Sequence, residues 1–130
     1  MATIRHLAIR TQDPEKLAYF YREAFGLKEL YREKKEGGAI FLTDGYFNFA
    51  LIPNLAQNAT NGLYHFGFQV DNADETTEKI SKLGMSKPPK TRPKDRPYAE
   101  VRAADPDGNY FDISENGFLE VRTIDGKEQN

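Results

Sequence analysis

The sequence predicts an α+β fold built from two copies of one unit, in which a strand and a helix precede three further strands (βαβββ). Three observations indicate the repeat. The two histidines of the chain, His6 and His65, each lie in a strand-like stretch with a small residue two positions later. A helix start follows each stretch, and each expected helix ends at a glycine, Gly26 or Gly84. This shared order of features is typical of an internal repeat.

The first unit begins with a strand at residues 4–10. Successive side chains of a strand point to opposite faces, so His6, Ala8 and Arg10 share one face. The aliphatic residues between them lie on the other face. His6 is therefore expected on the more polar side of this strand.

A helix is expected directly after this strand. Asp13 can cap the free amide groups, Pro14 suits the first helical position, and Glu15 suits the positive end of the helix dipole. Gly26 ends the helix. From the helical spacing, its apolar face is predicted to comprise Leu17, Phe20, Tyr21, Ala24 and Phe25.

Three strands complete the first unit, at residues 27–34, 39–43 and 46–52. The charged run at residues 33–36 predicts a solvated hairpin tip, and Asp44-Gly45 predicts a tight turn. Pro53 ends the last strand. The polar stretch at residues 54–62 predicts a linker between the two units.

The second unit begins with a strand at residues 64–70 that has two different faces. One face carries His65, Gly67 and Gln69, which together suit the floor of a shallow cavity. The opposite face is apolar and is expected to pack on a core; it comprises Tyr64, Phe66, Phe68 and Val70.

The second helix is predicted to start at Asn72, with Glu75 three residues later, and to end at Gly84. Its apolar face is predicted to comprise Thr76, Ile80 and Leu83. The segment 86–97 then contains four prolines and five basic residues, which predicts a loop or extended chain rather than a regular strand. Two interpretations of this segment stay open, a mobile lid and a solvated connection.

Two antiparallel strands close the second unit, at residues 98–103 and 109–114, with a turn at 105–108 between them. In the last strand Phe111 and Ile113 are expected to face the core. Asp112 then opens onto the side of the histidines, provided that the sheet curls around one cavity. Residues 118–124 suit a short extra strand before a polar tail.

The composition limits the classes of protein to consider. A chain of 130 residues suits a single domain, here two modules at about 1–53 and 63–117 with the linker 54–62 and a short C-terminal tail. A net charge of −2 without a basic block excludes a nucleic-acid footprint. The absence of cysteine leaves histidine and carboxylate as the strong metal ligands. With no leader pattern and no apolar run of membrane-spanning length, a cytoplasmic protein without a membrane partner is expected.

The duplicated βαβββ order, the histidine in each first strand, and the turn Asp105-Pro106-Asp107-Gly108 before a strand with a carboxylate resemble the vicinal oxygen chelate superfamily. This superfamily includes glyoxalase I, extradiol dioxygenases, and fosfomycin and bleomycin resistance proteins. The resemblance covers about residues 4–114. It implies a curved mixed sheet around a central cavity, a small-molecule substrate and a homodimer, and it leaves the reaction open.

In metal-binding members of that superfamily, the ligands come from the first and last strands of each module. Position by position, His6 and His65 match the two first-strand ligands, and Asp112 matches the final carboxylate, which is usually a glutamate. The remaining position falls at Ala50, which cannot bind a metal. The implied set of two histidines and one carboxylate resembles the facial triad of non-haem iron oxygenases, which favours Fe(II), with Mn, Ni or Zn as alternatives.

Six further residues are candidates for substrate binding, from their strand parity or from the proline-rich segment: Arg10, Asn48, Arg92, Arg96, Tyr98 and Tyr110. An arginine near the metal favours an anionic substrate. Three functions stay open. The first is a 2-His-1-carboxylate oxygenase acting on a small vicinal-oxygen substrate, the second a metal-dependent isomerase or lyase, and the third a metal-free binding protein of the resistance type. The missing glutamate argues against glyoxalase I in the strict sense.

Overall fold

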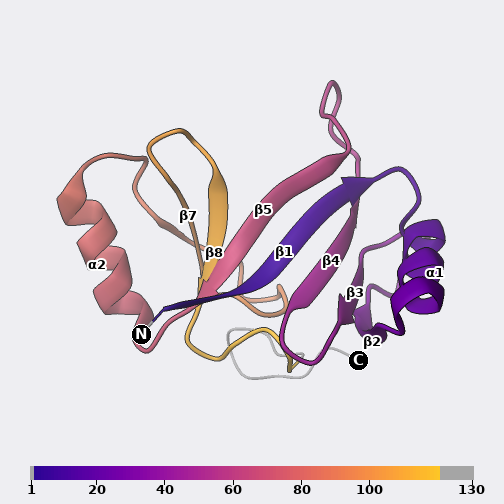
Figure 1. Cartoon of the computed structure of the whole chain (residues 1–130). Coiled ribbons are helices and arrows are strands. Elements are labelled where there is room, and N and C mark those ends of the chain that lie inside the picture. The colour runs from indigo at the N-terminus through magenta and orange to yellow at the C-terminus, as the bar shows by residue number, and fades with distance from the viewer. Residues whose placement is uncertain (1, 121–130) are drawn as a thin grey trace.

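One mixed sheet of eight strands forms the centre of the computed structural model, which describes residues 2–120 (Figure 1). The strands lie in the order β2-β3-β4-β1-β5-β8-β7-β6. Helix α1 (Pro14–Phe25) lies at one end of the curved sheet and helix α2 (Ala73–Leu83) at the other. These elements confirm the predicted α+β fold of two βαβββ units. The strands are β1 (Thr3–Thr11), β2 (Lys28–Arg32), β3 (Ile40–Thr43), β4 (Asn48–Pro53), β5 (Gly62–Gln69), β6 (Lys90–Thr91), β7 (Val101–Ala104) and β8 (Tyr110–Ser114).

The first strands of the two units, β1 and β5, pair antiparallel at the centre of the sheet. Strand β4 runs parallel to β1, and β8 runs parallel to β5. Ala50 pairs with Ala8, and Asp112 pairs with Gly67, each partner lying two positions after the histidine of its own strand. The register therefore makes Ala50 and Asp112 equivalent positions of the two units.

Helix α1 has the predicted ends. The Asp13 carboxylate accepts a hydrogen bond from the Lys16 amide at 3.1 Å, and Gly26 closes the helix at a φ of 72°. Its inner face differs from the prediction, because the small Ala18 is fully buried against the sheet while Phe20 and Phe25 are 58% and 70% exposed. A small side chain at the contact lets the helix approach β3 and β4 closely.

Helix α2 also begins and ends where predicted. The Asn72 side chain accepts a hydrogen bond from the Glu75 amide at 2.9 Å, and Gly84 follows the helix with a φ of 63°. Ala73 is buried on its inner face, whereas Leu83, predicted to face the core, is exposed. Within residues 2–120, neither helix has the length and apolar character needed to cross a membrane.

A β-bulge in β5 places Tyr64 on the cavity side, although strand alternation predicts it on the apolar face. Ala8 pairs with His65 and the next pair joins Ile9 to Leu63, so Tyr64 is the extra, unpaired residue. A bulge turns a side chain to the opposite face of its strand. Tyr64 thereby lines the cavity.

Strand β4 begins two residues later than predicted, because local hydrogen bonds form a turn before it. The Asp44 carboxylate accepts the amide N–H groups of Tyr46 and Phe47, each at 2.8 Å. These two residues complete a turn in place of the predicted strand start. The strand consequently begins at Asn48.

The last strands of the second unit are less regular than those of the first. Strand β6 has two residues, because the proline-rich segment around it offers few amide groups for pairing. Strand β7 begins at Val101 rather than at residue 98, since Tyr98 has a φ of 70°, far from extended backbone. Residues 118–120 form no strand, and the remainder of the predicted extra strand, at 121–124, lies outside the described residues.

Candidate metal centre

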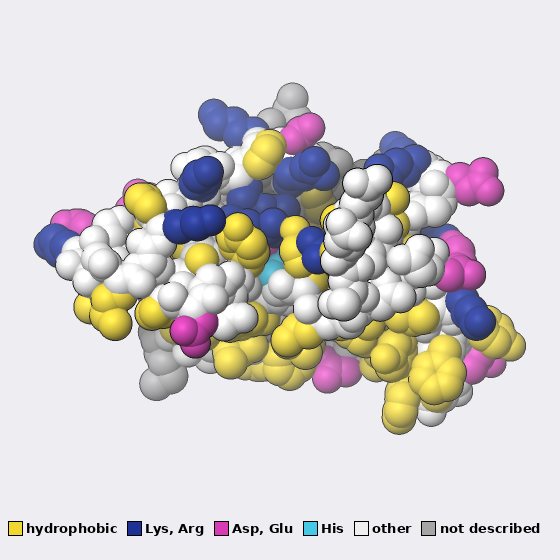
Figure 2. Space-filling view, turned by 90° about the horizontal axis from the view of Figure 1, so that it is seen from above, with side chains coloured by type: hydrophobic (Ala, Val, Ile, Leu, Met, Phe, Trp, Pro, Cys, Tyr) yellow, Lys and Arg dark blue, Asp and Glu magenta, His cyan; other side chains and the backbone are white. Residues whose placement is uncertain are grey.

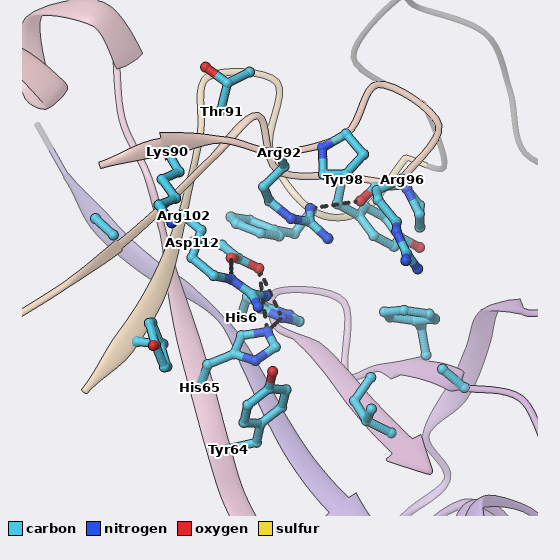
Figure 3. Close-up of a pocket in the computed structure, with 18 of the residues that line it drawn as sticks. His6, Tyr64, His65, Lys90, Thr91, Arg92, Arg96, Tyr98, Arg102 and Asp112 are labelled. Atoms are coloured by element: carbon cyan, nitrogen blue, oxygen red, sulfur yellow. Dashed lines mark hydrogen bonds and ion pairs between the residues drawn. The ribbon is translucent and has the colours of Figure 1, made fainter. Parts of the chain in front are cut away.

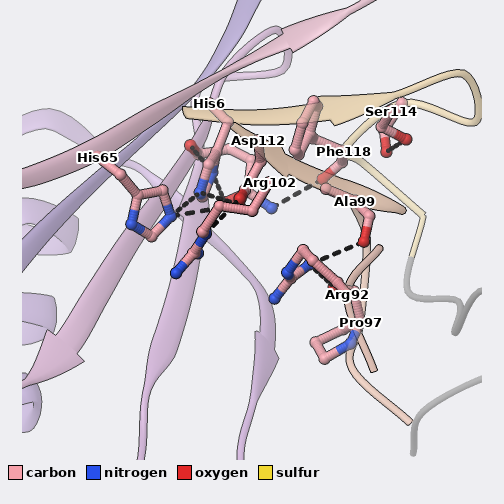
Figure 4. Close-up of polar contacts among 11 residues, drawn as sticks. His6, His65, Arg92, Pro97, Ala99, Arg102, Asp112, Ser114 and Phe118 are labelled. Atoms are coloured by element: carbon pink, nitrogen blue, oxygen red, sulfur yellow. Dashed lines mark hydrogen bonds and ion pairs between the residues drawn. The ribbon is translucent and has the colours of Figure 1, made fainter. Parts of the chain in front are cut away.

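Three buried side chains from neighbouring strands converge on one point: His6 from β1, His65 from β5 and Asp112 from β8 (Figure 4). The two imidazole Nε2 atoms lie 3.1 Å apart. Asp112 Oδ2 lies 3.3 Å from the Nε2 atom of His65 and 4.0 Å from that of His6. The structure thus brings together all three residues predicted as metal ligands.

These separations suit a divalent ion. Metal–nitrogen and metal–oxygen bonds to histidine and carboxylate measure about 2.0–2.2 Å, so adjacent ligands on an octahedron lie about 3 Å apart. The 3.1 Å and 3.3 Å separations match this edge, and the 4.0 Å separation needs a small inward movement of Asp112. Together the three residues form one face and leave the cavity side open.

Hydrogen bonds fix the tautomer of His6. Asn48 Nδ2 donates to the Phe118 carbonyl at 2.8 Å, which turns Asn48 Oδ1 towards the imidazole. His6 Nδ1 lies 2.9 Å from that Oδ1 atom and 3.1 Å from the Asn48 carbonyl, and both partners are acceptors. Nδ1 therefore carries the proton, so the lone pair of Nε2 faces His65 and Asp112.

The imidazole of His65 has an unsatisfied atom. Its Nδ1 is buried and has no hydrogen-bond partner in the described part of the chain. Its Nε2 faces the Nε2 lone pair of His6 and the Asp112 carboxylate. Without a metal, the His65 proton therefore lies on Nε2, where it meets these two acceptors. When that proton moves to Nδ1, the two Nε2 atoms and the carboxylate form a donor set that a cation satisfies.

The charge states of the three residues also suit a cation. Burial lowers the pKa of His6 from its usual 6.5 to about 4, although the Asp112 charge opposes this shift. Burial alone would raise the pKa of Asp112, but the His65 hydrogen bond and the charges of Arg92 and Arg102 hold it well below its usual range. At neutral pH His6 is therefore uncharged and Asp112 is ionised.

Arg102 is a functional residue that the sequence interpretation missed. Its Nε donates to Asp112 Oδ1 at 2.9 Å, so that Oδ2 alone faces the histidines. Arg102 and Asp112 are cross-strand partners in the β7–β8 hairpin. The sequence did contain a signal for this pairing, because the turn at residues 105–108 sets the register of the hairpin and so places Arg102 opposite Asp112.

Phe118 was also missed as a site residue. Its buried ring stacks on the His6 imidazole and lines the cavity. Phe118 follows the last strand of the unit and lies in a loop, where side chains do not alternate between two faces as they do in a strand. No pattern in the sequence connects it with His6.

A cavity of about 780 Å³ opens above the three converging residues (Figure 3). Among the predicted substrate-binding residues, four line this cavity: Arg92, Arg96, Tyr98 and Tyr110. Asn48 instead lies beneath His6, fully buried. Arg10 stacks on the ring of Tyr64, with its guanidinium carbon 3.8 Å from the ring centroid.

Comparison with known proteins agrees with the family resemblance seen in the sequence. Residues 3–113 match the family model of the Glyoxalase/Bleomycin resistance protein/Dioxygenase superfamily. The fold resembles methylmalonyl-CoA epimerase from Mycobacterium tuberculosis, with a TM-score of 0.66, 14% identity and 85% of each chain covered. A variant of Streptomyces coelicolor methylmalonyl-CoA epimerase, in complex with 2-nitronate-propionyl-CoA, gives a TM-score of 0.63 with 16% identity and 98% of each chain covered.

The 2,3-dioxygenase LapB from Pseudomonas sp. KL28 has a TM-score of 0.67 and 18% identity, over 98% of this chain and 46% of its own. At these identities the solved structures establish a shared fold. The family match spans nearly the whole described chain. By its sequence and its duplicated fold, the protein belongs to the Glyoxalase/Bleomycin resistance protein/Dioxygenase superfamily.

Proposed function

We propose that the protein is an Fe(II)-dependent oxygenase in which His6, His65 and Asp112 hold the metal. The proposed substrate is a small molecule with two vicinal oxygen atoms. One observation carries the proposal: three ligand atoms within 4.8 Å of one another converge while the equivalent fourth position is Ala50. A site with three protein ligands leaves positions free for two reactants.

A bound Fe(II) ion would supply coordination positions for both substrate oxygens and for O₂, and so permit their reaction on one centre. The protein contributes orientation and charge. Asn48 and Phe118 hold the His6 ring, and the Arg102 hydrogen bond holds the Asp112 carboxylate. The aromatic side chains of Phe41, Tyr98 and Phe118 line the cavity and offer an apolar wall to a flat substrate.

A second observation favours an oxygenase over an isomerase or lyase. Proton transfer at a substrate carbon needs a general base within hydrogen-bond reach. Among the described residues that line the cavity, the carboxylates are Asp112 and Glu33. Asp112 is in the ligand set, and Glu33 Oε1 accepts the Ala39 amide hydrogen at 2.7 Å. Of these carboxylate oxygens, only Glu33 Oε2 is left outside the ligand set and that hydrogen bond, so the described lining offers few candidates for such a base.

We further propose that the enzyme works in the cytoplasm as a homodimer. The chain has no cysteine, so its fold needs no disulfide and no oxidising compartment to form one. Three exposed aromatic side chains on α1 support an interface between copies: Tyr19, Phe20 and Phe25. Sedimentation analysis of the purified protein tests the dimer directly.

Elemental analysis of protein purified without added metal, and again after soaking with Fe(II), Mn(II), Ni(II) or Zn(II), tests the metal site. We expect about one ion per chain and its loss in His65→Ala. Thr91→Ala, in another residue that lines the cavity, is the matched control and keeps the ion. Failure of every ion to bind would leave only a metal-free binding protein.

Oxygen uptake then tests the reaction. With Fe(II) bound, we expect O₂ consumption to begin when a catechol is added and to be absent in His65→Ala. Metal binding without oxygen uptake, for any catechol of a panel, would contradict the oxygenase and favour Lewis-acid chemistry on the same ion.

A further inference from the structure

Positive charge gathers on one wall of the cavity. Figure 2 shows Lys and Arg side chains around a hollow in which a histidine is visible. Among the described residues that line the cavity, the only acids are Glu33 and Asp112. The basic residues there are Lys35, Lys87, Lys90, Arg92, Arg96 and Arg102. The cavity therefore has excess positive charge before any metal binds.

Arg92 is held in place by direct contacts with uncharged groups. Its Nη1 donates to the carbonyl oxygens of Pro97 at 3.2 Å and Ala99 at 2.9 Å, which orients the guanidinium. Both partners are uncharged, and within residues 2–120 no carboxylate lies at ion-pair distance from Arg92 or Arg96. Asp112 acts on Arg92 only from beyond ion-pair distance and is itself bonded to Arg102, so the half-buried, oriented Arg92 guanidinium keeps donors free for an anion.

Arg96 adds a second guanidinium to the same opening. Figure 3 shows the side chains of Arg92 and Arg96 reaching into the cavity from the proline-rich segment, across from His65. Burial lowers the pKa of Arg92 and the charges of Arg102 and Arg96 lower it further, whereas the carboxylates of Asp112 and Glu100 oppose this shift. The mutual repulsion of the arginines is relieved when an anion lies between them.

We propose that Arg92 and Arg96 form an oxyanion-binding site for a carboxylate or phosphate group of the substrate, separate from the metal ligands. The inference rests on the proposed function, in which the vicinal oxygens of the same substrate bind at His6, His65 and Asp112. A substrate held at both points spans the cavity. Its acidic group lies against the proline-rich segment 86–97, and its reactive oxygens lie at the bottom.

Isothermal titration calorimetry on the metal-free full chain tests this site, with inorganic phosphate and benzoate as probes at low ionic strength. We expect at least one probe to bind. Arg96→Gln and Arg92→Lys should each weaken that binding about tenfold, because each removes charge-assisted hydrogen bonds to the oxyanion. The probe that binds more tightly identifies the acidic group as phosphate or carboxylate.

Lys94→Gln is the matched control, because Lys94 is an exposed cation of the same segment and is not among the described lining residues. It should leave the affinity within about twofold. An equal loss in Lys94→Gln and Arg96→Gln, or no binding of either probe, would overturn the proposal.

Two further variants separate this inference from the metal site. His65→Ala should keep the affinity for the probe while losing the ion, and Arg96→Gln should keep the ion while binding the probe about tenfold more weakly. Failure of metal binding alone leaves the oxyanion site supported. Failure of probe binding alone leaves the metal site supported.

Discussion

The ring of Phe118 lies parallel to the imidazole of His6, with 5.0 Å between the ring centroids and 3° between the planes. Gly67 makes this contact possible, because a Cβ atom there would lie 2.9 Å from the Phe118 ring and 3.0 Å from His6 Cβ. Asn48 joins the two residues a second time, through His6 Nδ1 and the Phe118 carbonyl. The segment after β8 therefore sets the orientation of a proposed metal ligand on β1.

Phe118→Ala should destabilise the protein and weaken its metal site. Removing a buried aromatic ring costs about 3–5 kcal/mol, and here it also leaves one face of His6 without its packing partner. Urea unfolding of the metal-free protein measures the stability, and competition with a chelator measures metal affinity. Phe25→Ala, in an exposed ring of α1, is the control and should change neither by a comparable amount. Unchanged metal affinity in Phe118→Ala would contradict the orienting role.

Asn48→Ala should lower metal affinity about tenfold, the lower end of the usual effect of losing an acceptor behind a metal-binding histidine, because the carbonyl oxygen of residue 48 still accepts from His6 Nδ1. Asn48→Asp keeps an acceptor for His6 Nδ1–H but loses the donor to the Phe118 carbonyl. It should therefore bind metal better than Asn48→Ala while being less stable than the natural protein. Equal metal affinity in the two variants would show that the side-chain hydrogen bond from residue 48 to His6 has no part in binding.

The ends of the two helices were predictable because capping depends on local rules, whereas the convergence of the ligands was expected from strand alternation together with the resemblance to the vicinal oxygen chelate superfamily. Side chains such as Asp13 and Asn72 cap helices through their own neighbours, and strand alternation places Asp112 on the face of the histidines. The position of Tyr64 was not predictable, since it depends on which residues of β1 and β5 pair. Phe118 was missed for a similar reason, because its packing depends on the space above Gly67.

Acid should destabilise the metal-free protein between pH 6.5 and pH 4. The folded protein keeps His6 neutral down to a pKa of about 4, whereas the unfolded chain takes up a proton near 6.5. The unfolded state therefore binds more protons in this window, so the contribution of His6 is full above pH 6.5 and is lost as the pH falls through 4. The difference corresponds to about 3 kcal/mol. Asp112 stays ionised throughout this range, because its pKa is held below the usual value.

The free energy of unfolding, measured in urea at several pH values, checks this window. His6→Gln removes the titrating group, and its stability should vary much less between pH 6.5 and pH 4. The same steep loss in both proteins would assign the acid sensitivity to other groups.

Tyr98→Phe should stabilise the protein by about 1 kcal/mol, because it removes a buried hydroxyl that interacts with the Asn48 side chain but makes no hydrogen bond of good geometry in the described structure. Burial also raises the pKa of Tyr98, so this hydroxyl stays protonated and can donate to a bound substrate. The same variant should therefore weaken substrate binding. Thermal unfolding measures the first effect and the KM for O₂ uptake the second. Tyr46→Phe, in an exposed ring, is the control, and a loss of stability in Tyr98→Phe would show that the hydroxyl has a partner.

Ala50→Glu should convert the three-residue set into one with four protein ligands. The register pairs Ala50 with Ala8 as it pairs Asp112 with Gly67, so a carboxylate at residue 50 approaches the same point from β4. We expect tighter metal retention and loss of oxygen uptake, because a fourth ligand occupies a position that a reactant needs. Ala50 is fully buried, so the larger side chain costs about 1–3 kcal/mol through overpacking. Ala50→Met has similar bulk without a carboxylate, and should show the loss of stability without the gain in metal retention. If both variants retain metal equally, position 50 does not face the metal centre.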